Sequence, residues 1–186
     1  MSLDNQLLLL CSTFGQAIAL MALLTIFFGM IERLKWTELE RSTLHGFLFG
    51  CGAVFSMMSP FELQPGSVFD GRVIFVGLAA AFAGLPAALI SGALAVAFRI
   101  YTGGIGMVAG SLGIILAAST GYIWFRYMRP KKGYCSTKDL VVLGASLCFS
   151  MSALLLLPAE LALNAFMHVV PMLVIAIMIS SVVLGS

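Results

Sequence analysis

Charged residues are what this sequence has least of. Only 10% of its 186 residues are Asp, Glu, Lys or Arg, whereas 61% are hydrophobic and the mean hydropathy is +1.08. A water-soluble domain of this size needs a largely polar surface, so a soluble fold is excluded. Apolar runs long enough to cross a bilayer recur along the chain, and they are too long and continuous for barrel strands. The composition therefore predicts an all-α polytopic membrane protein.

The signatures of catalysis and metal binding are also missing from the sequence. The four cysteines show no CxxC spacing, and His45 and His168 have no Cys, His or carboxylate at ligand spacing. No Gly-rich phosphate loop, nucleophile elbow or pair of carboxylates on one helix occurs. We therefore expect no metal, no cofactor and no enzymatic activity in this segment.

Most of the basic residues gather in two stretches. One is ERLKWTELER, residues 32–41, and the other lies between Arg126 and Lys138. Short basic segments beside membrane helices are typical of cytoplasmic loops, so we expect no nucleic-acid binding and place both stretches inside. The opening MSLDNQ has no basic residue, so it lacks the start of a cleaved signal peptide. The sequence predicts a multi-pass membrane protein with its amino terminus outside and its carboxyl terminus in the cytoplasm.

The longest apolar stretch, VIFVGLAAAFAGLPAALISGALAVAF, lies between Arg72 and Arg99 and is interrupted only by Gly84-Leu85-Pro86. A continuous, proline-kinked helix over this interval is about 40 Å long at ~1.5 Å per residue, and it places the two arginines on opposite membrane faces. A chain that folds back at the Gly-Leu-Pro step brings both arginines to the same face. The first arrangement is typical of two membrane anchors, and the second indicates an anion-binding site.

The charge distribution favours a helical hairpin with halves at about Asp70–Ala83 and Pro86–Tyr101. With a single continuous helix, the two basic stretches fall on opposite sides of the membrane, which violates the preference for basic residues inside. Gly84 suits the end of a helix, and Pro86 suits the first turn of a new one. We therefore predict a hinge at Gly84 and Pro86.

The remaining apolar runs predict five further helices, which gives about seven helical segments in a single transmembrane domain over residues 1–186. These helices cover about Leu7–Ile31, Leu44–Met58, Gly106–Tyr127, Leu140–Leu157 and Leu161–Leu184. The segment PFELQPGSVFDG, residues 60–71, contains two prolines and two glycines and is predicted to be an external loop. Pro158-Ala159-Glu160 is predicted to form a tight external turn.

A glycine pair follows the predicted hairpin, directly before the next helix. Free backbone amides and the helix dipole at Gly103 and Gly104 favour an anion. Arg99 lies a few residues before this pair, and Ser111 offers a hydroxyl about two turns into the following helix. Most other glycines are expected to serve close helix packing.

A small carboxylate needs one or two guanidinium forks, amides and a hydroxyl to replace the water it loses. Arg72 and Arg99 supply the forks if the hairpin closes, and Asp70 lies close enough to orient or neutralise Arg72. The alternative is that each arginine reaches separately to the membrane interface or pairs with a lipid phosphate.

The central part of the chain, about residues 45–128, resembles the core of the LytS/YhcK-type family of transmembrane receptors, the 5TM receptor module. The shared pattern is an Asp/Asn-x-Arg start, a Gly-x-Pro break, an arginine after the second half-helix and a Gly-Gly turn. In this sequence the matching positions are Asp70, Arg72, Gly84-Leu85-Pro86, Arg99 and Gly103-Gly104. The break departs modestly from the commoner Gly-Pro pair, and the rest of the chain agrees with the family only in hydropathy.

The resemblance implies a sensory input domain of a bacterial histidine kinase or diguanylate cyclase, located in the bacterial cytoplasmic (inner) membrane. It implies small carboxylates such as pyruvate as the ligand class, with Arg72, Arg99 and Ser111 as contacts, and a cytoplasmic output domain beyond this chain. Such an input domain is expected to form a homodimer and to contact membrane lipids. A distant similarity to substrate-capturing subunits of vitamin importers leaves a small solute transporter as the alternative. A structural membrane protein without a ligand is the third reading.

Overall fold

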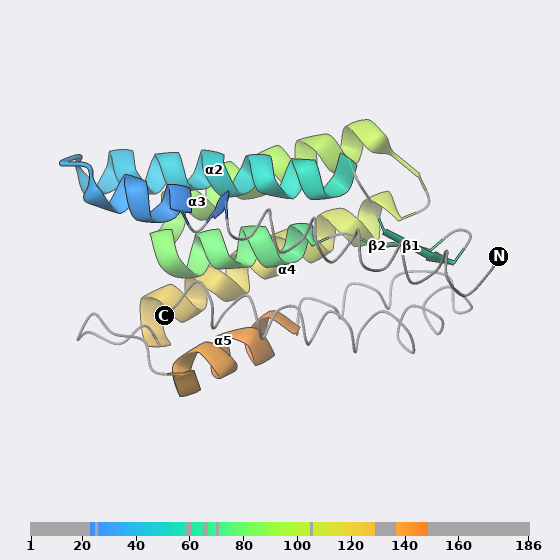
Figure 1. The fold of residues 1–186 in the computed structure, drawn as a ribbon. Coiled ribbons are helices and arrows are strands. Elements are labelled where there is room, and N and C mark those ends of the chain that lie inside the picture. Colours follow the sequence, from blue (N-terminus) through green and yellow to red (C-terminus); the bar gives the residue numbers. More distant parts are fainter. Residues whose placement is uncertain are drawn as a thin grey trace, which may run out of the picture.

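The computed structural model describes residues 23–24, 26–58, 61–64, 67–69, 71–104, 106–128 and 137–148. Residues 26–33 are helical and precede the labelled elements (Figure 1). These elements are α2 (Glu38–Met58), β1 (Phe61–Gln64), β2 (Ser67–Phe69), α3 (Arg72–Thr102), α4 (Met107–Ile123), the π-helical turn η1 (Trp124–Met128) and α5 (Thr137–Cys148). The described part of the chain is helical apart from two short strands, which confirms the predicted helical class.

Helix α2 begins earlier than its apolar run suggests. Thr37 and Glu40 form a reciprocal cap: the Glu40 amide donates to Thr37 Oγ1 at 3.3 Å, and the Thr37 amide donates to Glu40 Oε2 at 3.0 Å. The Thr37 amide, together with the Thr37 hydroxyl that donates to Glu40 Oε2 at 2.9 Å, holds the pKa of the Glu40 carboxyl below its usual value. The cap starts the helix at Glu38, whereas hydropathy predicted a start near Leu44; the predicted end at Met58 is confirmed.

The segment predicted to be an external loop contains a small antiparallel hairpin. Strands β1 and β2 pair with Phe61 opposite Phe69 and Gln64 opposite Ser67. The sequence between them is Pro65-Gly66, a dipeptide typical of turns. The prolines and glycines of this segment led to the prediction of a loop, and they gave no sign of the two short strands.

Helix α3 reverses direction at Gly84. The backbone there has φ 82° and ψ −161°, which interrupts the helix and separates a first half (residues 72–83) from a second half (residues 85–102). Both ends of α3 return to α4, because the side chains of Arg72 and Arg99 lie against the same residue, Gly110. The predicted hairpin is therefore confirmed and the continuous kinked helix is excluded (Figure 1). Pro86 lies at the start of the second half, where its missing N–H costs least.

Small residues bring the helices around this hairpin into close contact. Gly46 and Gly50 of α2 face the second half of α3, and Gly121 of α4 is buried against Gly77 in the first half. Glycine and alanine at such positions let membrane helices approach closely. The hairpin is thus packed between α2 and α4, and side chains from these three helices, from η1 and from α5 form most of the core. The largest fully buried apolar side chains are Trp124, Phe49, Leu78, Ile114, Leu143, Leu147 and Val76.

Two stretches of the described chain are long and apolar enough to cross a membrane, Arg72–Thr102 and Met107–Met128. The first of them is not a single crossing, because the break at Gly84 folds it back. Its halves are about 18 Å and 27 Å long at ~1.5 Å per residue, shorter than the ~30 Å hydrocarbon core. The short half-helices that the hairpin prediction implied are therefore present.

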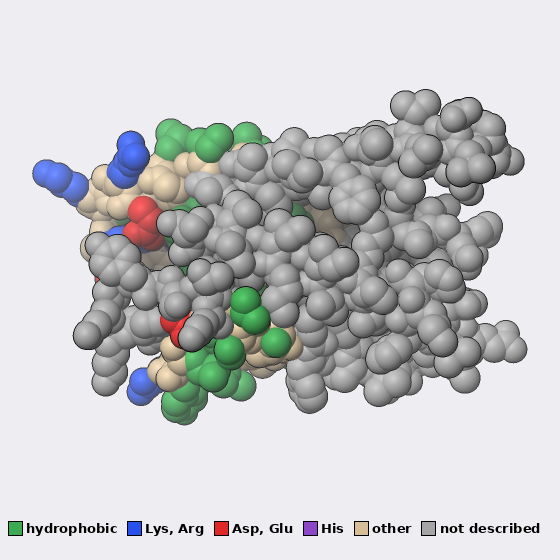
Figure 2. Space-filling model, turned by 60° about the horizontal axis from the view of Figure 1, so that its bottom comes forward, with side chains coloured by type: hydrophobic (Ala, Val, Ile, Leu, Met, Phe, Trp, Pro, Cys, Tyr) green, Lys and Arg blue, Asp and Glu red, His purple; other side chains and the backbone are tan. Residues whose placement is uncertain are grey.

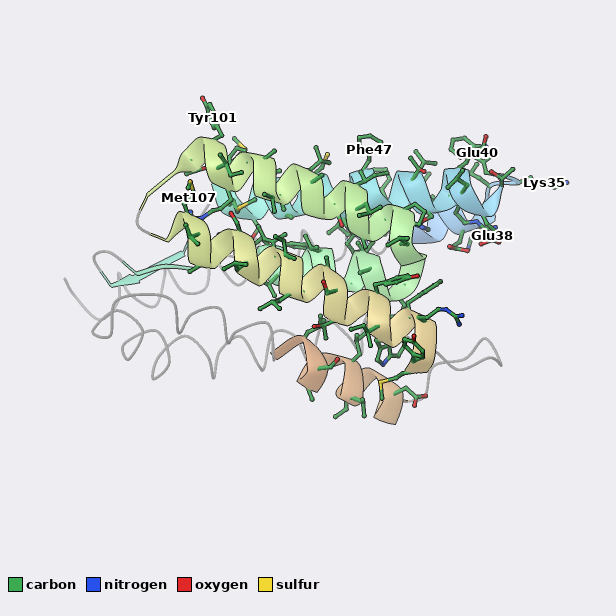
Figure 3. The ribbon with its side chains drawn as sticks, turned by 180° about the vertical axis from the view of Figure 1, so that it is seen from behind. Lys35, Glu38, Glu40, Phe47, Tyr101 and Met107 are labelled. Carbon is green, nitrogen blue, oxygen red and sulfur yellow. The ribbon has the colours of Figure 1, made fainter. Side chains whose placement is uncertain are left out.

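The bundle has two distinct ends. Tyr101 and Met107 lie together at one end, whereas Lys35, Glu38 and Glu40 lie at the other (Figure 3). The described Lys, Arg, Asp and Glu side chains that are visible in Figure 2 gather toward the second end. We call the first the arginine end, because Arg72 and Arg99 meet there, and the second the break end, because α3 reverses there at Gly84.

Some predictions fall on residues that the structure does not describe. The predicted helix at Leu161–Leu184, the external turn at 158–160 and most of the helix at Leu7–Ile31 lie outside the described residues, as does Asp70. Helix α5 begins at Thr137, close to the predicted start at Leu140.

Candidate functional site at the arginine end

The hairpin presents its two arginines from opposite chain directions. Arg72 is the first residue of α3, and the amide of the preceding Gly71 donates to Ser56 Oγ at 2.8 Å, which ties this helix start to α2. Arg99 lies in the last turn of α3, and its carbonyl accepts a hydrogen bond from the Gly103 amide at 3.0 Å. Both half-buried side chains are therefore held at the open end of the hairpin.

Gly110 of α4 lies under both guanidinium groups. A Cβ placed on Gly110 would lie 2.8 Å from Arg72 Nη2 and 2.8 Å from Arg99 Nε, closer than real Cβ atoms come to other heavy atoms. One turn earlier, a Cβ on Gly106 would lie 3.0 Å from Arg99 Nη2. Only glycine at position 110 lets the two groups lie on the helix backbone where they are.

The structure thus brings together the two arginines that the sequence analysis paired, and it adds Gly106 and Gly110. The sequence analysis assigned these two glycines to helix packing. Their spacing of four residues, which puts them on one face of a helix, was the available signal.

The other predicted site residues lie around this pair. Gly103 and Gly104 form the turn between α3 and α4, with φ values of 67° and 88°. The Gly103 amide is engaged by the Arg99 carbonyl, whereas the space beside both glycines is open. Ser111 follows Gly110 directly, and its Oγ is buried and makes no hydrogen bond to any described residue. Asp70 lies outside the described residues.

The electrostatics of this arrangement favour an anion. Two like charges at such close range repel each other by a few kcal/mol at an effective dielectric constant of about 20. The Nε of Arg99 is also buried, and it has no hydrogen-bond acceptor among the described residues. A small anion between the guanidiniums relieves the repulsion and accepts charge-assisted hydrogen bonds from planar donors.

A second polar cluster lies at the break end. Arg41 bridges two carboxylates, with Nη1 2.9 Å from Glu32 Oε2 and Nη2 2.8 Å from Glu38 Oε1. These carboxylates raise the pKa of the Arg41 guanidinium above its ordinary value. The buried His45 places Nε2 3.9 Å from Glu32 Oε1. The described part of the chain holds no group of three or more His, Cys, Asp or Glu side chains placed to bind a metal ion.

This cluster borders a cavity of about 180 Å³ beside the break in α3. The cavity is lined by Glu32, Glu38, Arg41, Ser42, His45, Phe82, Ala83 and Phe125. Its residues come from α2, the helical segment 26–33, the first half of α3 and η1. The described chain therefore has one polar cluster at each end of the hairpin.

Comparison with known proteins identifies the chain. A family model described as 5TMR of 5TMR-LYT matches residues 24–186, well beyond the central stretch on which the resemblance to LytS-type receptors rests. No curated protein and no solved structure matches the chain significantly. This match agrees with the apolar helices and with the hairpin that pairs the two arginines. The chain belongs to the 5TMR-LYT family, whose members are transmembrane receptor modules of signalling proteins and not catalytic domains.

Proposed function

We propose that this chain is the sensory module of a bacterial histidine kinase or diguanylate cyclase, and that it binds a small extracytoplasmic carboxylate at the arginine end. The observation that carries the proposal is the convergence of Arg72 and Arg99 on Gly110. The two guanidiniums come from opposite ends of α3, so a single bound anion holds the two halves of the hairpin together at its open end.

The donors at this site match a carboxylate. Two buried polar atoms make no hydrogen bond to any described residue: the Nε of Arg99 and the Oγ of Ser111, the residue after Gly110. A hydrogen bond to a charged group contributes about 1.5–3 kcal/mol, so two or three such bonds account for micromolar to millimolar binding. Each guanidinium offers a planar fork that matches the two carboxylate oxygens.

The geometry argues against arginines that serve only the lipid headgroups. An arginine that reaches to the interface directs its guanidinium away from the bundle. Here the two guanidiniums lie on the backbone of α4, and the Nε of Arg99 is buried. Lipid phosphate binding therefore explains the position of the pair less well than a ligand held inside the bundle.

Isothermal titration calorimetry tests the proposal. The chain in lipid nanodiscs is titrated with pyruvate, lactate and acetate, and with the uncharged amide of pyruvate as the ligand control. We expect Arg72→Ala and Arg99→Ala each to weaken pyruvate binding at least tenfold, because each removes one fork. Arg126→Ala, an exposed arginine from the other end of α4, is the matched control and leaves the affinity unchanged. Equal affinity in all four proteins refutes the site.

Arg99→Lys sharpens the same experiment, since lysine keeps the charge and loses the fork.

Uptake by proteoliposomes separates the receptor from the alternative of a small solute transporter, because a receptor accumulates no pyruvate. Kinase and cyclase output domains act in pairs, so a homodimer belongs to this proposal, and chemical crosslinking in membranes tests it.

A further inference from the structure

A hydroxyl from another helix forms hydrogen bonds on both sides of the break in α3. Ser42 of α2 is 8% exposed, and its Oγ donates to the Ala83 carbonyl at 2.5 Å and accepts from the Ala87 amide at 3.2 Å. Ala83 is the last residue of the first half of α3, and Ala87 lies in the first turn of the second half. These are the kinds of backbone groups that a helix end leaves without a partner. Ser42 therefore bonds to both halves at once.

A second element covers the break from η1. A Cβ placed on Gly84 would lie 3.1 Å from the ring of Phe125, and the positive φ at Gly84 already requires glycine. Phe125 belongs to the π-helical turn that ends α4. Single π-helical turns within α-helices are frequent at functional sites. The pivot of the hairpin is thus in contact with α2 on one side and with the end of α4 on the other.

We propose that Ser42 is the contact through which the spacing of Arg72 and Arg99 at the arginine end is transmitted to α2. Only the identity of the ligand in this scheme rests on the function proposed above. Each half of α3 is a regular helix, and the two join at Gly84, so a change in spacing at the open end changes their angle at the pivot. Ser42 bonds to both halves at that pivot, and α2 moves with them.

A shift of Ser42 reaches the ion pairs at the start of α2. Ser42 directly follows Arg41, which pairs with Glu38 on α2 and with Glu32 on the helical segment before it. A shift of Ser42 therefore changes the geometry of these ion pairs and the start of α2. This end of the bundle also carries the basic stretch that the sequence analysis placed in the cytoplasm, where an output domain receives the signal.

A thermodynamic cycle separates this role from a purely local cap. Arg99 and Ser42 lie at opposite ends of the second half of α3, roughly 20 Å apart at ~1.5 Å of rise per residue. Substitutions more than about 10 Å apart with no shared partners are additive, so a non-additive pair indicates transmission through the hairpin. A cap that acts only on its own backbone partners gives an additive cycle.

The cycle is measured by the hydrogen–deuterium exchange rates of the backbone amides of residues 38–46 in α2. The chain in lipid nanodiscs is compared without ligand as wild type, Arg99→Ala, Ser42→Ala and the double variant. We expect Arg99→Ala to change exchange in this segment at least threefold when Ser42 is present and less than 1.5-fold when it is Ala. Equal changes in both backgrounds, or no change in either, overturn the proposal.

Thr43→Ala is the matched control, because the Thr43 hydroxyl donates only within α2, to the Leu39 carbonyl at 2.8 Å. We expect the response to Arg99→Ala to persist in this background, and its loss there overturns the assignment to Ser42. If Ser42→Ala does not fold, Ser42→Cys replaces it, since a thiol is a much weaker hydrogen-bonding group. Carboxylate binding plays no part in the cycle, so failure of the proposed function and failure of the transmission are seen separately.

Discussion

At Gly110, the absence of a side chain sets the position of two charges. Arg72 Nη2 and Arg99 Nε each lie 2.8 Å from the position that a Cβ on this residue would take, so the site depends on a residue with no side chain. Gly110 lies in the first turn of α4, so the positive end of the helix dipole also acts on an anion bound there. The specificity of the arginine end is therefore set by α4 as well as by the arginines.

Gly110→Ala is expected to weaken pyruvate binding at least tenfold with little loss of stability. The new methyl group meets the flexible ends of two arginines, which move aside without disturbing the core. Calorimetry gives the affinity and a thermal melt gives the stability. Gly92→Ala is the control, because its Cβ meets only the Ala118 Cβ at 4.0 Å, an ordinary contact. Unchanged affinity in Gly110→Ala contradicts the position assigned to the guanidiniums.

Residues differ in how far the sequence reveals their roles. The pairing of Arg72 and Arg99 is predictable because the distribution of basic residues requires a hairpin, which brings both ends of the apolar run to one face. Ser42 is not predictable, since its partner Ala83 is 41 residues away and the contact depends on how α2 packs on the hairpin. Gly106 and Gly110 resemble ordinary packing glycines until the arginines are placed over them.

At the scale of elements, α3 shows why a hairpin can hide inside a single helical run. Its hydropathy and length satisfy the criteria for one membrane-spanning helix, and only Gly84 has a non-helical backbone inside it. The distribution of basic residues revealed the reversal, because it concerns where each end of the helix must lie. The start of α2 was missed because it was predicted from hydropathy alone, and the cap formed by Thr37 and Glu40 does not change hydropathy.

Gly84→Ala is expected to lower the free energy of unfolding by about 1–3 kcal/mol, because a residue with a Cβ is strained at this φ and meets Phe125. Pro86→Ala is expected to cost much less, because proline at the start of a helix adds only local rigidity. Unfolding in mixed micelles with increasing sodium dodecyl sulfate measures both. Equal stability of the two variants shows that the break does not need a positive φ.

At the scale of the whole molecule, charge separates the two ends of the bundle. The described basic residues at the break end come from the segment before α2, from the first turn of α2 and from η1, whereas the arginine end carries Arg72 and Arg99. The sequence analysis predicted this separation, and the structure confirms which residues share an end. Which end faces the cytoplasm remains part of the proposal, and it follows from the excess of basic residues in cytoplasmic segments.

Cysteine labelling in intact bacterial cells tests this orientation. Tyr101 is 88% exposed at the arginine end, and Tyr127 is 79% exposed in η1 at the break end. With the native cysteines replaced by serine, a membrane-impermeant maleimide is expected to label Tyr101→Cys from outside. Tyr127→Cys is expected to react only after permeabilisation. The reverse pattern inverts the proposed orientation, and labelling of both from outside contradicts the separation of the two ends.

The reversal at Gly84 also fixes the sidedness of everything that follows it in the chain. A hairpin that starts and ends on one face adds an even number to the count of crossings, so α4 starts on the face where α3 began. A change that straightened the break would convert this even number to an odd one and invert every later segment. With the break end in the cytoplasm, as we propose, the basic stretch after α4 would then have to cross the membrane, which the membrane potential and the insertion machinery oppose. The positive φ of a single glycine thus determines on which side of the membrane every later segment lies.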